Sequence, residues 1–463
     1  MDQNHLGKFL KLSSLESPTI EYQLFNFGKE SLKQIFLNSK CGEIINGKEF
    51  KDKPSNSNLV GTKHIYPLSC LYKKAKPKIN PSNNIYHWKE DKIKKEVNIL
   101  SNAYMSLSLL TLADYYNEII KDEKTRKEIV KFYVSSVKCQ LNFYVNNFRN
   151  ELGLFVDKSL KDDDSDKKHK KENSSIQFES FDDSFDFPAQ AYLMISFLKC
   201  SNMLKDTSPY KIPFLNFSEE IEKMFLDFKD NILKSKTNTL IELIQAFQIY
   251  ISLKQDLNIN LLNLTLDILE ILSSKNVLSY MWTYDKIILY KTLLSLKSQL
   301  NHFNEYTKDI YNSICEYLWE IEEFFSLKNI NKNEIINAYD LISYQIYTLN
   351  VNKEEAHDFY NNVLLPSKIF SCFPNIPKKY EGEKYFKFDH NEKYLIPDKF
   401  FKPHSYKTMD EISLTPIICK DVYYSSDKHK FSKPKIKFNS LLNMRLIFFI
   451  LHNLKNIIIK TMK

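Results

Sequence analysis

The segment Asp186-Phe187-Pro188-Ala189-Gln190-Ala191-Tyr192-Leu193-Met194-Ile195-Ser196-Phe197-Leu198 is the starting point for interpreting this sequence. A run of residues this apolar predicts a helix that is surrounded by protein on all sides. Inside it, an amide residue, an alanine and an aromatic residue follow one another. The same triplet recurs at residues 102–104, 245–247 and 337–339, near the start of other strongly apolar segments. The sequence therefore contains an internal repeat.

Fully apolar segments alternate along the chain with segments that carry a single apolar stripe. Segment 125–146 has Val130, Val134, Val137 and Leu141 on one face and lysines off it, which is typical of a helix with one solvated side. Ser218 is a suitable N-cap for a second striped helix. The hairpins predicted in this way span residues 97–146, 188–234, 239–272, 285–325 and 334–365. The apolar segment 441–459, paired with a short helix at 30–37, would complete a sixth.

The composition excludes several classes of protein. Seven glycines among 463 residues leave no GxGxxG or GxxxxGK[ST], so a dinucleotide-binding fold or a P-loop is disfavoured. The 65 basic and 57 acidic residues are interspersed, so we expect no nucleic-acid partner. The seven cysteines form no CxxC and the histidines no HxxxH, so we expect no metal and no cofactor. No signal peptide is apparent, and we predict a reducing, cytoplasmic location.

Alternating buried and half-buried helices in successive hairpins resemble the (α/α) toroids of the six-hairpin glycosidase-like proteins. Residues 96–365 carry the resemblance, and residues 437–460 supply a closing helix. It implies an all-α fold, an (α/α) toroid of five or six helical hairpins with small β-hairpin excursions. It also implies a funnel whose mouth lies where the inner helices begin, and which commonly holds saccharides and acidic catalytic residues. These proteins share no single motif, so the resemblance assigns no catalytic residue by position.

Two regions complete the expected organisation. Residues 1–95 form an entry region with a short helix and a β-hairpin at 44–50. Residues 96–463 form the toroid domain, with insertions at 148–187 and 366–436. The second insertion contains another predicted hairpin, at residues 385–396, where two aromatic-rich runs flank a four-residue loop.

The candidates for the site are residues just before the inner helices, the recurring amide Gln190, and Asp157, whose loop after the first outer helix would return toward the mouth in such a toroid. Sugar sites combine a flat aromatic face with carboxylates, and glycoside cleavage uses two of them. The candidate catalytic residues are Asp183, Asp186, Asp285 and Asp157. The candidate substrate-binding residues are Trp88, Trp282, Tyr284 and Gln190. The alternative is structural: acids are favoured at any helix start by the helix dipole, and the recurring amides would bind interhelical backbone.

The leading prediction is a cytoplasmic carbohydrate-active protein, a glycoside hydrolase or an epimerase-like enzyme that uses carboxylate acid/base chemistry on a saccharide or another small polar ligand. One alternative is a non-catalytic binding or scaffold protein that keeps the helical ring. The other is a membrane-surface protein that uses its apolar C-terminal helix, which would leave Phe448, Phe449 and Ile458 exposed. Arg445 and Lys455 bracket nine residues, too few for the ~20 that a membrane-spanning helix needs.

Overall fold

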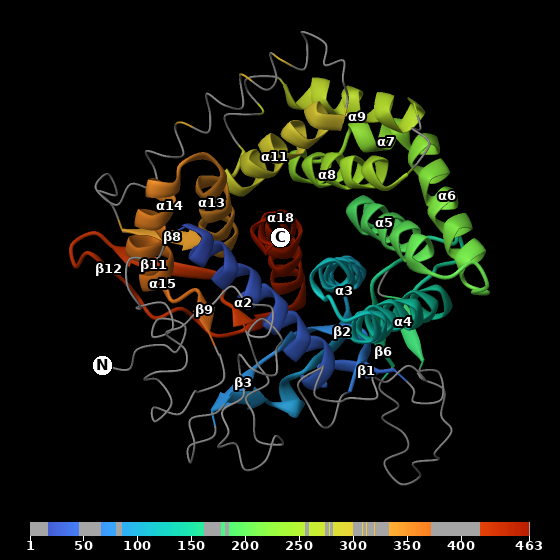
Figure 1. Ribbon diagram of the computed structural model, residues 1–463, viewed down its shortest axis with the longest axis horizontal. Helices are drawn as coiled ribbons and strands as arrows, with labels where there is room; N and C mark the ends of the chain where they lie inside the picture. The colour runs from blue at the N-terminus through green and yellow to red at the C-terminus, as the bar shows by residue number, and fades with distance from the viewer. Residues whose placement is uncertain are drawn as a thin grey trace.

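Helices dominate the molecule, as the sequence predicted (Figure 1). The predicted β-hairpin at 385–396, residues 46–50 of the other predicted hairpin, and the second helix of the 285–325 hairpin all lie outside the part that can be described. The computed structural model describes residues 17–45, 66–79, 86–161, 177–180, 185–254, 259–273, 277, 281–299, 308, 312, 319, 333–371 and 417–462.

Six apolar helices pack against one another in sequence order. Helix α3 contacts α5, α5 contacts α8, α8 contacts α11, α11 contacts α13, α13 contacts α18, and α18 contacts α3. They lie toward the middle of the view in Figure 1. Their bounds are Ile99–Ile119 for α3, Phe187–Met203 for α5, Thr237–Leu253 for α8, Thr283–Gln299 for α11, Ala338–Val351 for α13 and Ser440–Met462 for α18. We call these the inner helices.

A second set of helices packs against them from outside (Figure 1). Helix α4 contacts α3, α6 contacts α5, α9 contacts α8, α14 contacts α13, and α2 contacts α18. The predicted stripe of α4 faces inward, with Val134, Val137 and Leu141 buried. The bounds are Ser17–Asn38 for α2, Glu123–Asn147 for α4, Lys211–Asp227 for α6, Lys229–Leu233 for α7, Ile259–Leu272 for α9, Lys353–Phe359 for α14 and Leu365–Ser367 for α15.

The predicted N-cap of the second striped helix was wrong. Helix α6 begins at Lys211, so Ser218 lies in its interior. Pro213 is tolerated there because it falls in the first turn, where N–H groups have no intrahelical partner. The buried hydroxyl of Ser218 donates to the carbonyl of Met194 at 3.1 Å and so joins α6 to α5. The helix predicted at 30–37 is also longer in the structure, where α2 starts at Ser17.

Short antiparallel strands lead into several inner helices. Strand β5 directly precedes α3, β8 precedes α13 and β13 precedes α18. The largest sheet has the order β1-β2-β5-β6-β7, with β13 paired to β2. These strands therefore lie at the amino ends of the helices. The bounds are Gly42–Ile44 (β1), Leu68–Ala75 (β2), Pro77–Ile79 (β3), Tyr86–Trp88 (β4), Lys94–Val97 (β5), Lys158–Leu160 (β6), Phe178–Ser180 (β7), Glu334–Asn337 (β8), Phe370–Ser371 (β9), Ile417–Ile418 (β10), Asp421–Ser425 (β11), Lys430–Phe431 (β12) and Phe438–Asn439 (β13).

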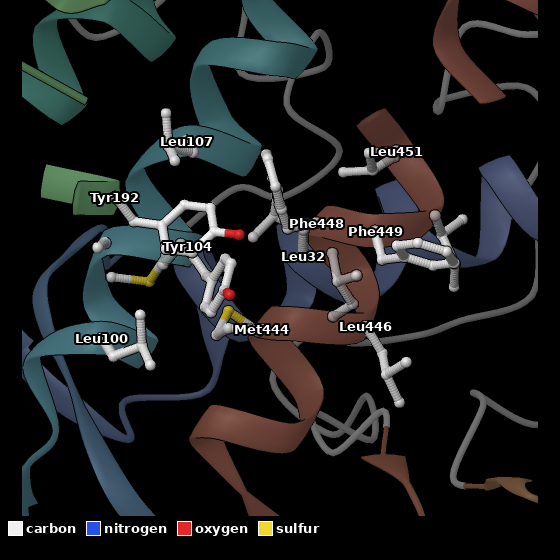
Figure 2. Packing of buried hydrophobic residues seen from close by; sticks show 14 of the residues in the cluster. Leu32, Leu100, Tyr104, Leu107, Tyr192, Met444, Leu446, Phe448, Phe449 and Leu451 are labelled. Atoms are coloured by element: carbon white, nitrogen blue, oxygen red, sulfur yellow. The ribbon is translucent and has the colours of Figure 1, made fainter. Parts of the chain in front are cut away.

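Helix α18 lies in the core between α3 and α2 (Figure 2). Phe448 contacts the rings of Tyr104 and Tyr192, with centroids 5.5 and 6.0 Å away. Residues 440–461 are long and apolar enough to cross a membrane, but 67% of the most apolar window is buried inside the protein. Phe448, Phe449 and Ile458 are all buried. The protein itself thus covers most of the apolar surface of this helix, including the three residues that a membrane-surface helix would leave exposed.

Candidate functional site

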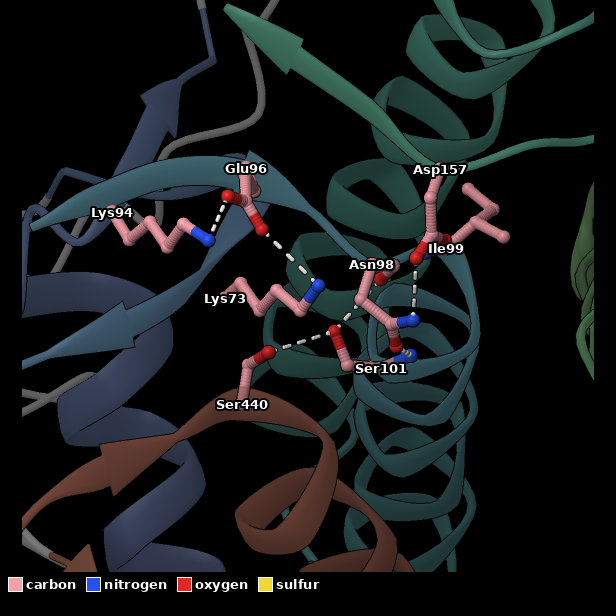
Figure 3. Close-up of polar contacts among 8 residues, drawn as sticks. All are labelled: Lys73, Lys94, Glu96, Asn98, Ile99, Ser101, Asp157 and Ser440. Atoms are coloured by element: carbon pink, nitrogen blue, oxygen red, sulfur yellow. Dashed lines mark hydrogen bonds and ion pairs between the residues drawn. The ribbon is translucent and has the colours of Figure 1, made fainter. Parts of the chain in front are cut away.

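The amino end of α3 is held by a network of polar side chains (Figure 3). Asn98 is the N-cap, and its side chain accepts a hydrogen bond from the Ser101 N–H at 2.9 Å. Asp157 accepts from the Ile99 N–H at 2.8 Å and from the Asn98 side-chain amide at 2.9 Å. The hydroxyl of Ser440 from α18 donates to that of Ser101 at 3.1 Å. Asp157 therefore has a structural role at the start of α3, which the sequence did not predict.

Two of the recurring amides form the same pair of hydrogen bonds with the backbone of one extended residue. The Asn102 carbonyl oxygen accepts from the Leu71 N–H at 2.7 Å, and its amide donates to the Leu71 carbonyl at 3.1 Å. Gln190 forms the same pair of bonds with Phe155, at 3.1 and 2.7 Å. A buried side-chain amide has an N–H to donate and a carbonyl oxygen to accept, which matches the C=O and N–H of one extended residue. We call these pairs the amide clamps.

Two of the predicted amides act differently, and a further clamp was missed. Gln245 accepts from the Tyr192 hydroxyl at 2.7 Å, and Asn337 caps α13 by accepting from the Asp340 N–H at 2.8 Å. Asn443 in α18 forms a third clamp: it accepts from the Ile418 N–H at 2.8 Å and donates to the Ile418 carbonyl at 3.4 Å. No alanine follows Asn443, so the triplet did not identify it. The signal that could have done so is the spacing N-x-x-x-N, which residues 98–102 share with residues 439–443.

Arg445 and Glu242 form an ion pair among the inner helices. Nη2 of Arg445 lies 2.8 Å from Oε1 and 2.9 Å from Oε2 of Glu242. The guanidinium lies over the rings of Tyr104 and Tyr339, 5.7 and 5.6 Å from their centroids. Both charged side chains are mostly buried, with 15% of Arg445 and 8% of Glu242 exposed. The Nε of Arg445 is buried with no hydrogen-bond partner among the described residues. We call this pair and its aromatic neighbours the arginine centre.

Carboxyl groups at the amino ends of neighbouring helices interact with the arginine centre. Burial raises the pKa of Asp285, in the first turn of α11, to about 6, against the lowering effect of Arg445. The pKa of Asp186, the N-cap of α5, is also raised to about 6, by desolvation and by the charge of Glu242, although its side chain reaches solvent. Burial raises the pKa of Glu242 and of Asp340 as well. Groups that ionise near neutral pH can both donate and accept protons.

Of the predicted site residues, Asp186, Asp285 and Tyr284 lie around the arginine centre. The buried ring of Tyr284 contacts Tyr339, with centroids 4.8 Å apart, and Arg445 contributes to its electrostatic environment. Trp282, directly before α11, is 67% exposed. An aromatic face open to solvent therefore precedes Asp285 by three residues.

The other predicted site residues have different surroundings. The side chain of Gln190 is hydrogen-bonded to the backbone of Phe155, and that of Asp157 accepts from the backbone N–H of Ile99, as described above. Trp88 is 7% exposed and meets Phe438 edge-on at 5.0 Å. Asp183 lies outside the described residues. The centre therefore gathers part of the predicted set and leaves another part in packing and capping roles.

Sequence reasoning missed Arg445 and Glu242 as site residues, and also their aromatic neighbours Tyr104 and Tyr339. A signal for Arg445 was present in the repeat. Tyr104, Tyr192 and Tyr339 each follow a recurring amide by two residues, and Arg445 follows Asn443 by the same interval. In α3, α13 and α18, the residue two positions after the amide lies in the arginine centre, because Arg445 contacts both Tyr104 and Tyr339.

Comparisons with protein-family models, with curated proteins and with solved structures gave no match for this chain. Among the described residues, no group of three or more His, Cys, Asp or Glu side chains is arranged to hold a metal ion.

Proposed function

We propose that the six inner helices form the inner wall of an (α/α) toroid and that their amino ends bind a saccharide. The inner-helix contacts run from α3 through α5, α8, α11 and α13 to α18, which contacts α3 again. Outer helices accompany five of the six. This is the arrangement that successive helical hairpins produce when they close on themselves. The proposal includes the cytoplasmic location that the sequence predicted.

In this proposal, Asp285 and Asp186 share the acid/base chemistry. Cleavage of a glycosidic bond needs a carboxylic acid that protonates the leaving oxygen and a carboxylate that assists the incoming nucleophile. Asp285 is the more buried of the two and is suited to keep its proton. Asp186 reaches solvent and is suited to activate water. An epimerase-like reaction would use the same pair to remove and return a proton.

The arginine centre would supply recognition. Its unpartnered Nε–H is a buried donor, and a buried donor without a partner is costly unless something binds it. A sugar hydroxyl is a suitable acceptor. Trp282 offers an exposed flat face for the apolar side of a sugar ring. The observation that carries the proposal is that Asp186 and Asp285, at the amino ends of α5 and α11, lie near a buried arginine whose Nε has no partner among the described residues.

The test is a saccharide array followed by product analysis on the glycans that bind. Wild type is compared with Asp285→Asn, Trp282→Ala and the matched control Asp230→Asn, which changes an exposed acid on α7. We expect Asp285→Asn to keep binding but to lose turnover by about 10²-fold or more, because it removes the proton donor. Trp282→Ala should weaken binding about tenfold. Absence of glycan binding by wild type, or full turnover by Asp285→Asn, would contradict the proposal.

One observation favours a second candidate, a non-catalytic scaffold. Tyr104, Tyr192 and Tyr284 are buried around the Arg445–Glu242 pair, so aromatic side chains already fill much of the space among the helices. In that case the centre would serve the fold. No saccharide would be retained on the array, and Asp285→Asn would change stability alone.

A further inference from the structure

A second cluster of charged side chains lies farther along the same helices. Lys199 of α5 and Lys455 of α18 both approach Asp114 of α3, with Nζ to Oδ2 distances of 2.6 and 3.3 Å. Lys291 of α11 donates to the amide oxygen of Asn453 at 3.0 Å. Lys455 is ten residues after Arg445, which places the cluster roughly 15 Å away along α18. We call it the lysine cluster.

The lysine cluster carries excess positive charge. The ammonium groups of Lys199 and Lys455 pair with the Asp114 carboxylate, whereas that of Lys291 has the neutral amide of Asn453 as its partner. All three ammonium groups act on the ring of His452, which lies among them. Among the described residues, these four charged groups therefore carry a net charge of +2 (3 − 1). His452 adds none, because burial and the three lysines lower its pKa to about 3. Burial lowers the pKa of Lys291 to about 8, so it stays largely protonated at pH 7. Mostly buried charges need partners, and here part of the charge is unbalanced.

The helix dipole does not account for this charge. Cations are favoured at the carboxyl end of a helix, but the effect falls off within the last turn. Lys291 lies eight residues before Gln299, the last residue of α11, and Lys455 lies seven before Met462, the last of α18. Lys199 is near the end of α5, but it already has Asp114 as a partner. Two of the three lysines are therefore in helix interiors, where the dipole offers little.

We propose that Lys199, Lys291 and Lys455 bind a phosphate group, as inorganic phosphate or as the phosphate of a larger ligand. A phosphate monoester carries between −1.5 and −2 charges near neutral pH, which matches the net charge of the cluster. Lysine binds phosphate as a point charge and does not require the fixed geometry of arginine. Solvent reaches the site, since 19% of the Lys455 and 31% of the Asp114 side chain are exposed.

The test uses the full chain at pH 7 and constant ionic strength, with phosphate replacing chloride. Binding is followed by broadening of the phosphorus-31 resonance and by the thermal unfolding midpoint. We expect phosphate to broaden the signal and to raise the midpoint by about 2 °C or more, because a ligand that binds the folded state stabilises it. Equal behaviour in phosphate and chloride would overturn the proposal.

Variants assign the effect to the cluster. Lys291→Met should reduce phosphate affinity at least tenfold, whereas Lys223→Met, which removes an exposed lysine on α6, should leave it unchanged. Without phosphate, Lys291→Met should unfold at the same midpoint as wild type or higher, because it removes a poorly balanced, largely buried charge. Unchanged affinity in Lys291→Met would place the anion elsewhere.

A parallel titration with glycerol 3-phosphate separates the two sources of phosphate. Tighter binding of the monoester indicates a larger phosphorylated ligand, and equal or weaker binding indicates the free ion. The wild-type comparison with chloride needs no variant, so equal behaviour in the two anions overturns the proposal even if Lys291→Met fails to fold. Because the lysine cluster is distant from Trp282, Trp282→Ala should bind phosphate normally whether or not the saccharide proposal holds.

Discussion

Arg445 shows how a single buried charge organises its surroundings. Desolvation of a guanidinium and a carboxylate costs several kcal/mol each, and their attraction repays this cost only when the geometry is good. The Nη2 of Arg445 contacts both carboxylate oxygens of Glu242, and Tyr104 and Tyr339 present ring faces to the cation. We therefore expect the two charges to interact strongly, so that removal of either one lowers the free energy of unfolding.

Glu242→Gln should lower the free energy of unfolding by about 3 kcal/mol, as urea denaturation would measure. The estimate is at the low end for a broken buried pair, because Asp186 and Asp285 still offset part of the Arg445 charge. Glu219→Gln, on an exposed position of α6, is the control and should change stability by less than about 0.5 kcal/mol. A Glu242→Gln variant as stable as this control would mean that the ion pair contributes nothing to the fold.

Candidate site residues at the starts of helices could be predicted from the sequence, whereas those inside helices could not. Asp186 and Asp285 were identified because an acid before or within the first helical turn is visible in the sequence. Glu242 and Arg445 lie within apolar segments, where periodicity says which residues are buried but not which partner they meet. Their pairing joins α8 to α18 across 203 positions of the chain, and no local pattern encodes it.

The amide clamps act at the scale of elements. Each one fixes an extended segment against the first turns of an inner helix and satisfies a backbone N–H and C=O that would otherwise be buried without partners. Asn102 holds β2 to α3, Gln190 holds the loop before β6 to α5, and Asn443 holds β10 to α18. The clamps therefore locate the amino ends of three inner helices relative to the short strands.

Gln190→Ala should reduce the free energy of unfolding by about 2 to 4 kcal/mol. Phe155 is buried, so its N–H and C=O would both lose their partner without regaining water. Asn216→Ala, at an exposed position of α6, is the matched control in a chemical-denaturation series. If the two variants lose equal stability, the clamp is not what secures this segment.

The order of the helices could be predicted from the sequence, but several of their first and last residues could not. The alternation of apolar and striped segments predicted the order of inner and outer helices from α3 to α9, because burial on one or all sides leaves a local pattern. The start of α6 was misplaced by seven residues, from Lys211 to Ser218. A buried serine that bonds to a neighbouring helix looks the same in sequence as a capping serine.

At the scale of the whole molecule, charge is divided along the inner helices. Carboxyls gather at the amino ends around Arg445, and lysines gather farther along around Asp114. The contacts that establish this arrangement join distant parts of the chain, such as Ser101 with Ser440 across 339 positions. The amide–alanine–aromatic repeat predicted that the helices share one environment. It could not predict which charges would meet, since that depends on how α18 packs against α3.

The central claim, that Asp285 is a buried carboxyl of the arginine centre, has a consequence for the stability of the entire protein. Its folded-state pKa of about 6 exceeds the value of 3.8 for a solvated aspartic acid, so the folded state binds more protons between these pH values. The stabilising contribution of protonated Asp285 is complete below pH 4 and is lost as the pH rises through 6. Asparagine at this position cannot titrate and lacks that dependence.

The most direct measurement is therefore the difference in unfolding free energy between Asp285→Asn and wild type from pH 4 to pH 8. We predict that the difference shifts in favour of Asp285→Asn by on the order of 2 to 3 kcal/mol, mainly between pH 4 and pH 6. Asp230→Asn, at an exposed position of α7, is the control. A difference for Asp285→Asn that stays constant across this range would show that Asp285 titrates as a solvated acid, and would contradict the account of the arginine centre.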